Sequence, residues 1–216
     1  MAIEPFNLMP LHEAVQTLGL DHHFQGRATL SQFESKNFVR HFPNDTFIEG
    51  DLDMDSLLWS ESLAGMVFDG DLELNGSIFN WEIDTPAAFM AIRGNLKCRN
   101  IVFGSMDLVV RGNVTAANLI VATYNHGYLL IHGEVRAKYV IIDDDGDSVI
   151  EGSVRADGWN ASRNARVDLR RSEWINEVRP EFRSEFFEEN GDFRCPNGNV
   201  DLVKALLAER HILREH

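Results

Sequence analysis

Hydrophobic residues alternate with polar ones around six glycines in the first two thirds of the chain. The glycines stand at positions 50, 70, 94, 112, 133 and 152, with spacings of 20, 24, 18, 21 and 19 residues. The residues two before and two after each glycine are apolar, whereas the residues directly beside it are polar. Alternation with a period of two is typical of a β-strand that buries one face.

A second short apolar run follows seven to nine residues after each of the first five glycines. These runs are LLW (57–59), SIF (77–79), IVF (101–103), LIV (119–121) and VII (140–142). Two strand segments in a repeat of about 20 residues predict one coil of a parallel β-solenoid, in which stacked neighbours supply the core. The predicted fold class is therefore all-β, a parallel β-helix of about six coils.

Both ends of the chain have helical spacing of their apolar residues, at 9–20 and 199–213. We expect short helices there that cap the unpaired strand edges at each end of the stack. The predicted organisation is an N-terminal helical cap and lead-in (1–45), six coils (46–161), and a connecting arm with a C-terminal capping helix (162–216).

The differences in repeat length all fall between the second apolar run and the next coil. These corner segments have lengths of 6, 10, 4, 7 and 5 residues, which account for the uneven glycine spacing. Insertions gathered at one corner of a solenoid often mark its binding face. The candidate partner-binding residues lie in these corners: Glu61, Trp81, Glu82, Asp84, Tyr124, Asp143, Asp144, Asp145 and Asp147.

Charge adds a preference for one kind of partner. The net charge is −14, and the window between His41 and Met90 holds eleven acids and no Lys or Arg. Such a field repels nucleic acid and anionic membranes and attracts a basic protein. Solubility alone is the alternative explanation for the acidity.

The chain gives no signal for export or for a membrane. Its first residues lack a basic segment before an apolar core, and no apolar run reaches the roughly 18 to 20 residues that span a bilayer. Cys98 and Cys195 make no disulfide framework. We therefore expect a cytoplasmic protein.

Candidate chemistry is sparse, so neither an enzyme nor a cofactor is predicted. The aspartates at 143–147 fail the EF-hand spacing, because the sixth and twelfth positions from Asp143 are Ser148 and Val154. His126 and His132 have no third metal ligand in view. Cys98 aligns with small core residues of other coils. A metal-dependent enzyme on a β-helix is the minor alternative.

The repeated unit, clearest in VVRGNVTAANLIVATYNHGYLLIHGEVRAKYVII (109–142), resembles that of bactofilin-like polymer-forming bacterial proteins. The resemblance covers roughly residues 46–161 and implies a parallel β-helix that assembles end to end without nucleotide. More loosely, the stretch resembles uncharacterised bacterial β-solenoid proteins of toxin–immunity loci.

Two functions fit these features. The first is a non-catalytic acidic binding protein, an immunity or inhibitor protein that neutralises a basic protein partner such as a toxin. The second is a bactofilin-like self-assembling structural protein, and monomer and homodimer both stay open. An apolar column three residues before each glycine would suit a lateral interface unless the terminal helices cover it. The column comprises Phe47, Val67, Ala91, Val109, Leu130 and Val149.

Overall fold

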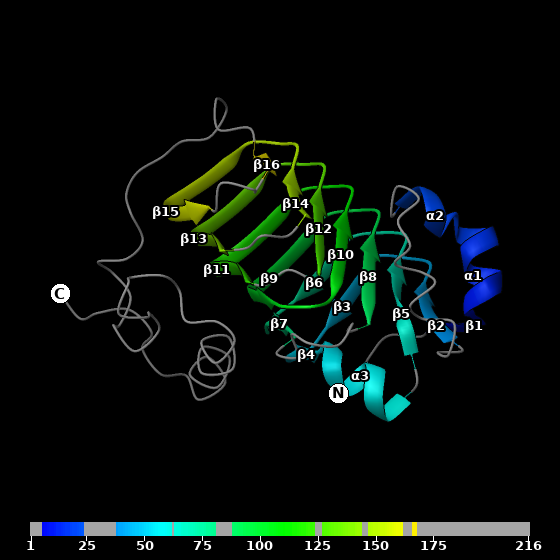
Figure 1. Ribbon diagram of the computed structural model, residues 1–216. Helices are drawn as coiled ribbons and strands as arrows, with labels where there is room; N and C mark the ends of the chain where they lie inside the picture. Colours follow the sequence, from blue (N-terminus) through cyan, green and yellow to red (C-terminus); the bar gives the residue numbers. More distant parts are fainter. Residues whose placement is uncertain are drawn as a thin grey trace.

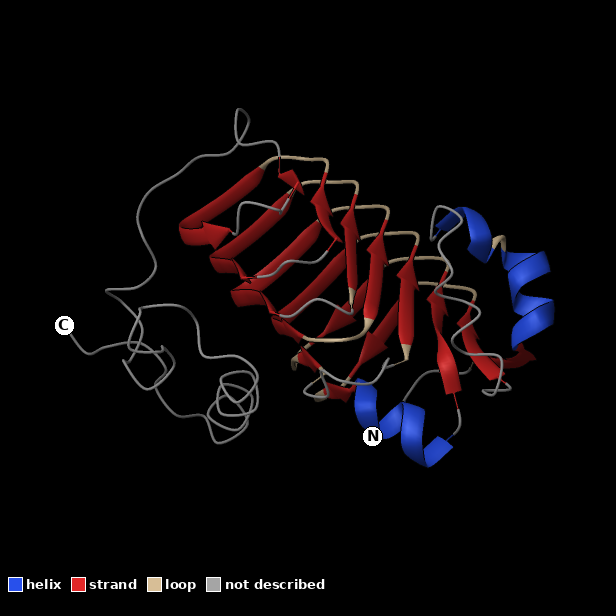
Figure 2. Cartoon of the chain, in the orientation of Figure 1, coloured by secondary structure: helices blue, strands red, loops and turns tan. Residues whose placement is uncertain are grey.

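The computed structural model describes residues 6–23, 38–61, 63–80, 88–123, 127–143, 147–161 and 166–167. Two long sheets run side by side along the molecule, and the chain passes from one to the other in each turn (Figure 1). The strands dominate the described residues, with helices only at the margins (Figure 2). The predicted all-β parallel β-helix is therefore confirmed.

The first sheet has the order β1-β2-β5-β8-β10-β12-β14-β16. Its strands are β1 (Asn7–Pro10), β2 (Phe38–Phe42), β5 (Leu63–Phe68), β8 (Phe89–Ile92), β10 (Asp107–Val110), β12 (Tyr128–Ile131), β14 (Asp147–Ile150) and β16 (Arg166–Val167). Its strand pairs are parallel except β1 with β2, which is antiparallel. The strand β1 is therefore the antiparallel edge strand at one end of this sheet.

The second sheet has the order β15-β13-β11-β9-β6-β3, and two short strands, β4 and β7, extend it beside β9. Its strands are β3 (Thr46–Ile48), β4 (Leu52–Asp53), β6 (Leu72–Leu74), β7 (Ile78–Phe79), β9 (Leu96–Phe103), β11 (Val114–Thr123), β13 (Val135–Asp143) and β15 (Val154–Ala161). All its pairs are parallel.

The turns stack on the glycine repeat from Gly70 onward, but Gly50 does not begin it. Phe42 pairs with Phe68, which gives Asn44 the position that Gly70 holds one turn later. Gly50 lies instead beside Gly76, at a different corner. The predicted starting point is wrong, and the stack from Asn44 onward has about five turns. Parallel stacking already begins with β2, inside the segment assigned to the N-terminal lead-in.

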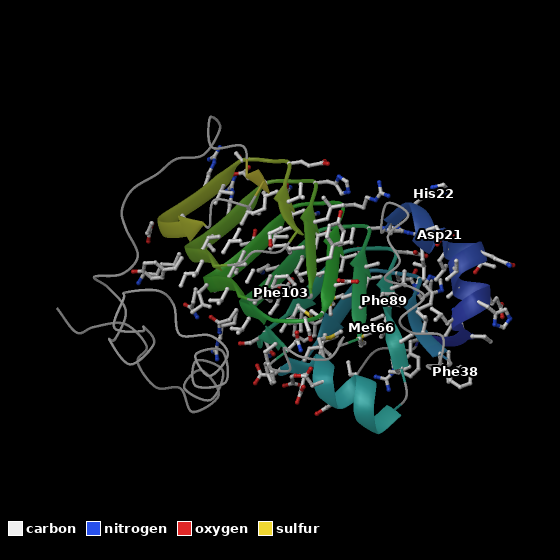
Figure 3. All side chains as sticks on the ribbon, viewed as in Figure 1. Asp21, His22, Phe38, Met66, Phe89 and Phe103 are labelled. Carbon is white, nitrogen blue, oxygen red and sulfur yellow. The ribbon has the colours of Figure 1, made fainter. Side chains whose placement is uncertain are left out.

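The core is the stack of inward-pointing side chains between the sheets (Figure 3). The rings of Phe42 and Phe68 stack with their centroids 4.5 Å apart. Cys98 is buried in the same core, and burial raises the pKa of its thiol to about 12. The thiol therefore stays protonated at neutral pH, and the predicted core position of Cys98 is confirmed.

The segment LLW (57–59) is helical, so the predicted strand there is wrong. It lies in α3 (Met54–Glu61). The reason is the residue before the helix, because Asp53 Oδ1 accepts hydrogen bonds from the N–H groups of Asp55 and Ser56, both at 3.1 Å. A side-chain acceptor at this position satisfies the first donors of a helix and favours it over a strand.

The apolar column considered as a lateral interface is not a free surface. Val67, Ala91, Val109 and Leu130 are at most 1% exposed. They belong to one buried cluster with residues of α1 (Leu11–Leu18) and α2 (Leu20–His23). Phe47 stands elsewhere, because it pairs with Glu73 in the second sheet. The helix predicted near the N-terminus, at 9–20, is confirmed by α1. The helix predicted at 199–213 lies outside the described residues.

Replacing each of two glycines with alanine should distinguish the energetic cost of lost close packing from that of backbone strain. A Cβ at residue 112 would lie 2.5 Å from the carbonyl oxygen of Gly94, whereas one at Gly50 would meet nothing within 4 Å. Gly50 has a φ of 93°, so its substitution costs only strain. We expect Gly112→Ala to lower the free energy of unfolding by about 3 kcal/mol and Gly50→Ala by about 1 kcal/mol. Urea denaturation measures both, and equal losses would contradict the stacked corner.

Candidate interaction surfaces

Three of the nine predicted partner-binding residues lie in the part of the chain that the structure describes. Glu61 ends α3, Asp143 ends β13 and Asp147 begins β14, each placed by its backbone alone. The remaining candidates lie outside the described residues: Trp81, Glu82, Asp84, Tyr124, Asp144 and Asp145.

The corner that carries the glycines is held by a ladder of side-chain oxygens. Asp45 Oδ1 accepts the N–H of Asp71 at 2.8 Å, and Asp71 Oδ1 accepts the N–H of Asn95 at 2.7 Å. Asn95 and Asn113 repeat the contact to the next turn at 2.9 and 2.8 Å. We call Asp45, Asp71, Asn95 and Asn113 the Asx ladder. Each rung satisfies a corner N–H that has no strand partner.

The first two turns present an acidic surface made of exposed carboxylates: Asp45, Glu49, Asp51, Asp71 and Glu73. Of the described residues in these turns, the one arginine is Arg40. Its guanidinium is partly covered and lies over the ring of Phe6, 4.7 Å from the centroid. The acidic window of the sequence thus becomes a surface at one end of the stack.

The later turns present the opposite charge on the outer face of the second sheet. The exposed cations there are Lys97, Arg99, Arg136, Lys138 and Arg155. The only described carboxylate that bridges two of them is Glu134, whose Oε1 lies 3.0 Å from Arg136 Nε and 2.7 Å from Arg155 Nε. Its hydrogen bond from Arg136, with the charges of both arginines, lowers the pKa of Glu134.

The sequence analysis did not predict this basic face, because the net charge sums over all residues and hides a local excess of cations. Its signal is local: the cations recur three and five residues after glycines 94 and 133, and three after glycine 152. A shallow groove runs over β11, β13 and β15 between these columns, with an alanine-rich floor. Its lining includes Thr115, Ala117, Arg136, Ala137, Lys138 and Arg155.

A polar cluster joins α2 to the solenoid beside the glycine corner. Asp69 lies 2.8 Å from His41 Nε2 and 2.6 Å from Arg93 Nη1. Arg93 also donates from Nε to His23 Nε2 at 3.1 Å and from Nη2 to the Leu18 carbonyl. Burial lowers the pKa of His23 to about 4, helped by the charges of Arg111, Arg93 and His132 and opposed by Asp69. His23 therefore accepts this hydrogen bond as a neutral ring.

The described residues contain no group of three or more His, Cys, Asp or Glu side chains arranged to hold a metal ion. His132, one of the histidines considered for zinc, is instead paired with Glu151, with 2.7 Å between Nδ1 and Oε2. Within the same part of the chain, no helix has both the length and the apolar character to cross a membrane.

Comparison of the chain with protein-family models, with curated proteins and with solved structures found no match.

The Asx ladder predicts that an amide can replace a carboxylate at position 71 but a methyl group cannot. Asp71→Ala leaves the Asn95 N–H without its acceptor, and we expect a loss of about 1–2 kcal/mol in the free energy of unfolding. Asp71→Asn retains the acceptor and should lose less than half of that. Urea denaturation of the two variants measures the difference, and equal losses would show that the rung contributes nothing.

His23 should make the protein less stable in acid. The unfolded chain binds a proton at His23 near pH 6.5, whereas the folded chain resists it until about pH 4. Stability should therefore fall as the pH drops through this window. His23→Gln keeps an acceptor for Arg93 but does not titrate, so its urea midpoint should fall less between those two pH values. If the urea midpoints of the variant and the parent fell by the same amount between these pH values, this role of His23 would be ruled out.

Proposed function

We propose that this protein is a non-catalytic binding protein whose acidic first turns bind a basic protein partner. A cytoplasmic immunity or inhibitor protein that neutralises a basic toxin is the narrower form of this proposal. Opposite charges across an interface steer encounter and fix register.

The observation that carries the proposal is the change of residue along the Asx ladder. Asp45 and Asp71 accept backbone N–H groups in the first turns, and Asn95 and Asn113 make the same contact in the following turns. The hydrogen bond therefore does not require a charge. The fold requires a hydrogen-bond acceptor at positions 45 and 71, but it does not require the negative charge of an aspartate there. We attribute that charge to binding.

Self-assembly is the second candidate function. Four of the six residues in the apolar column that first suggested it are buried, so its support moves to the outer face of the second sheet. That face carries carboxylates near one end and cations near the other, which lets one copy complement another.

The double variant Asp45→Asn/Asp71→Asn tests the binding proposal, because it removes two charges and keeps both ladder acceptors. The immobilised protein is incubated with extract of its own host at about 0.05 M and about 0.5 M salt, and captured proteins are identified by mass spectrometry. We expect a basic protein that is retained at low salt and released at high salt. The double variant should bind it about tenfold more weakly, because two exposed charge pairs are lost.

Glu13→Gln is the matched control. Glu13 is an exposed acid on α1, outside the acidic surface, so its neutralisation should leave capture unchanged. Capture that is insensitive to salt, or equal losses in the control and the double variant, would contradict a specific acidic binding surface.

A further inference from the structure

One outward residue from each turn forms a continuous column on the outer face of the second sheet. Strand register places these residues next to one another in the order Phe47, Glu73, Lys97, Thr115, Arg136 and Arg155. We call this set the outer column, and it follows β3, β6, β9, β11, β13 and β15 in Figure 1. All six side chains are exposed. The column is apolar and acidic at its first end and basic at its last.

Phe47 is the feature of the outer column that calls for an explanation. Its side chain is 46% exposed on β3, the edge strand of the second sheet, and it is more exposed than Phe6 (37%) and Phe38 (38%). At the far end of the same column, the shallow groove offers an alanine-rich floor beside Arg136 and Arg155, with Asp157 also in its lining. An exposed aromatic ring and an apolar groove of the same face suit each other as anchor and pocket.

We infer that the outer face of the second sheet binds a second copy of this chain in an antiparallel, two-fold dimer. The axis passes between the turns of Lys97 and Thr115, so the first turn of each copy meets the last turn of the other. Glu73 then opposes Arg136 of the partner subunit. Phe47 opposes Arg155 of the partner subunit, at the edge of the groove.

The repeat keeps all rows of the two columns in register at once. Stacked turns in both copies repeat at the same strand spacing of about 4.8 Å, so aligning one row aligns the others. A two-fold axis makes each contact twice. A parallel arrangement would instead set Glu73 against Glu73 and Arg136 against Arg136. Like charges placed opposite each other destabilise an interface, which selects the antiparallel one.

Glu73 already contacts one cation within its own chain, since Lys97 Nζ lies 2.6 Å from its Oε1. Both side chains of this pair are more than half exposed. An exposed pair of this kind contributes little and does not hold the carboxylate away from a further partner. Glu73 also belongs to the acidic surface, so a basic partner and a second copy should exclude each other there.

The dimer is tested by reversing the charge at one position in each of two variants and then mixing the variants. Multi-angle light scattering measures the mass of the full chain at about 0.15 M salt. The parent should have twice the chain mass of 24.5 kDa, that is 2 × 24.5 = 49.0 kDa. Glu73→Lys alone and Arg136→Glu alone should each be monomers of 24.5 kDa. An equal mixture of the two variants should return to 49.0 kDa, because each contact again pairs opposite charges.

Phe47→Ala tests the anchor without altering charge. Its dimer dissociation constant should rise at least about tenfold, as for loss of an aromatic anchor that fills a pocket. Leu8→Ala is the matched control, because Leu8 is 55% exposed on β1 and lies outside the outer column. Circular dichroism confirms that each variant is folded. A mass shift in Leu8→Ala equal to that in Phe47→Ala would overturn the proposed anchor.

A parent that stays at 24.5 kDa at high concentration, or two variants that do not recombine, would overturn the proposal. Assemblies that grow beyond the dimer on mixing would replace the two-fold axis with a head-to-tail contact and would also overturn it. These measurements contain no basic partner, so their failure leaves the binding proposal to its own experiment.

Discussion

The stacked corner is the constraint on which the rest of this structure depends. Parallel turns bring backbone close to backbone where the chain bends, and the N–H groups there must find acceptors in the neighbouring turn. Glycine supplies the close approach, as the hydrogen bonds from Gly112 N–H to Gly94 O and from Gly133 N–H to Gly112 O show. The Asx ladder supplies the remaining acceptors. Both requirements recur once per turn, which is why the sequence repeats so visibly there and so loosely elsewhere.

This division of labour leaves the outward positions free to carry function. A corner residue must be small or must be an acceptor, whereas the outward positions of β6, β9 and β13 have no such requirement. Acidic and basic side chains can therefore be sorted along the stack without disturbing it. Among the described residues, the first two turns carry exposed carboxylates, and the later turns carry the exposed lysines and arginines together with the exposed acids Glu151 and Asp157.

The fold could be predicted from sequence wherever each turn met the stacking requirement with the same residue types. From Gly70 onward glycine recurs, and the period and the buried columns emerged correctly. The first turn uses Asn44 in place of glycine, and a nearby Gly50 offered a false match. The helix at 54–61 was missed because its signal is the single capping residue Asp53, which a search for apolar runs ignores.

The functional surfaces were harder to predict for a different reason. Counting charged residues along the sequence identified the acidic turns, because their residues are contiguous in the chain. The basic face draws one or two residues from each of several turns, so only the correct register brings them together. Burial was equally hard to predict, since Val67 and Val109 belong to the column predicted to face outward yet are fully buried. A periodic pattern reveals which residues share a column, but not what packs on top of it.

The antiparallel strand β1 gives the stack a direction. Added coils from another molecule would have to extend the first sheet in parallel register, and at this end they would meet β1 running the opposite way. Pro10, the last residue of β1, lacks an N–H and cannot donate to a further strand. The strand β1 therefore occupies the N-terminal edge of the first sheet, so a further coil at this end could not pair with β2 in parallel register.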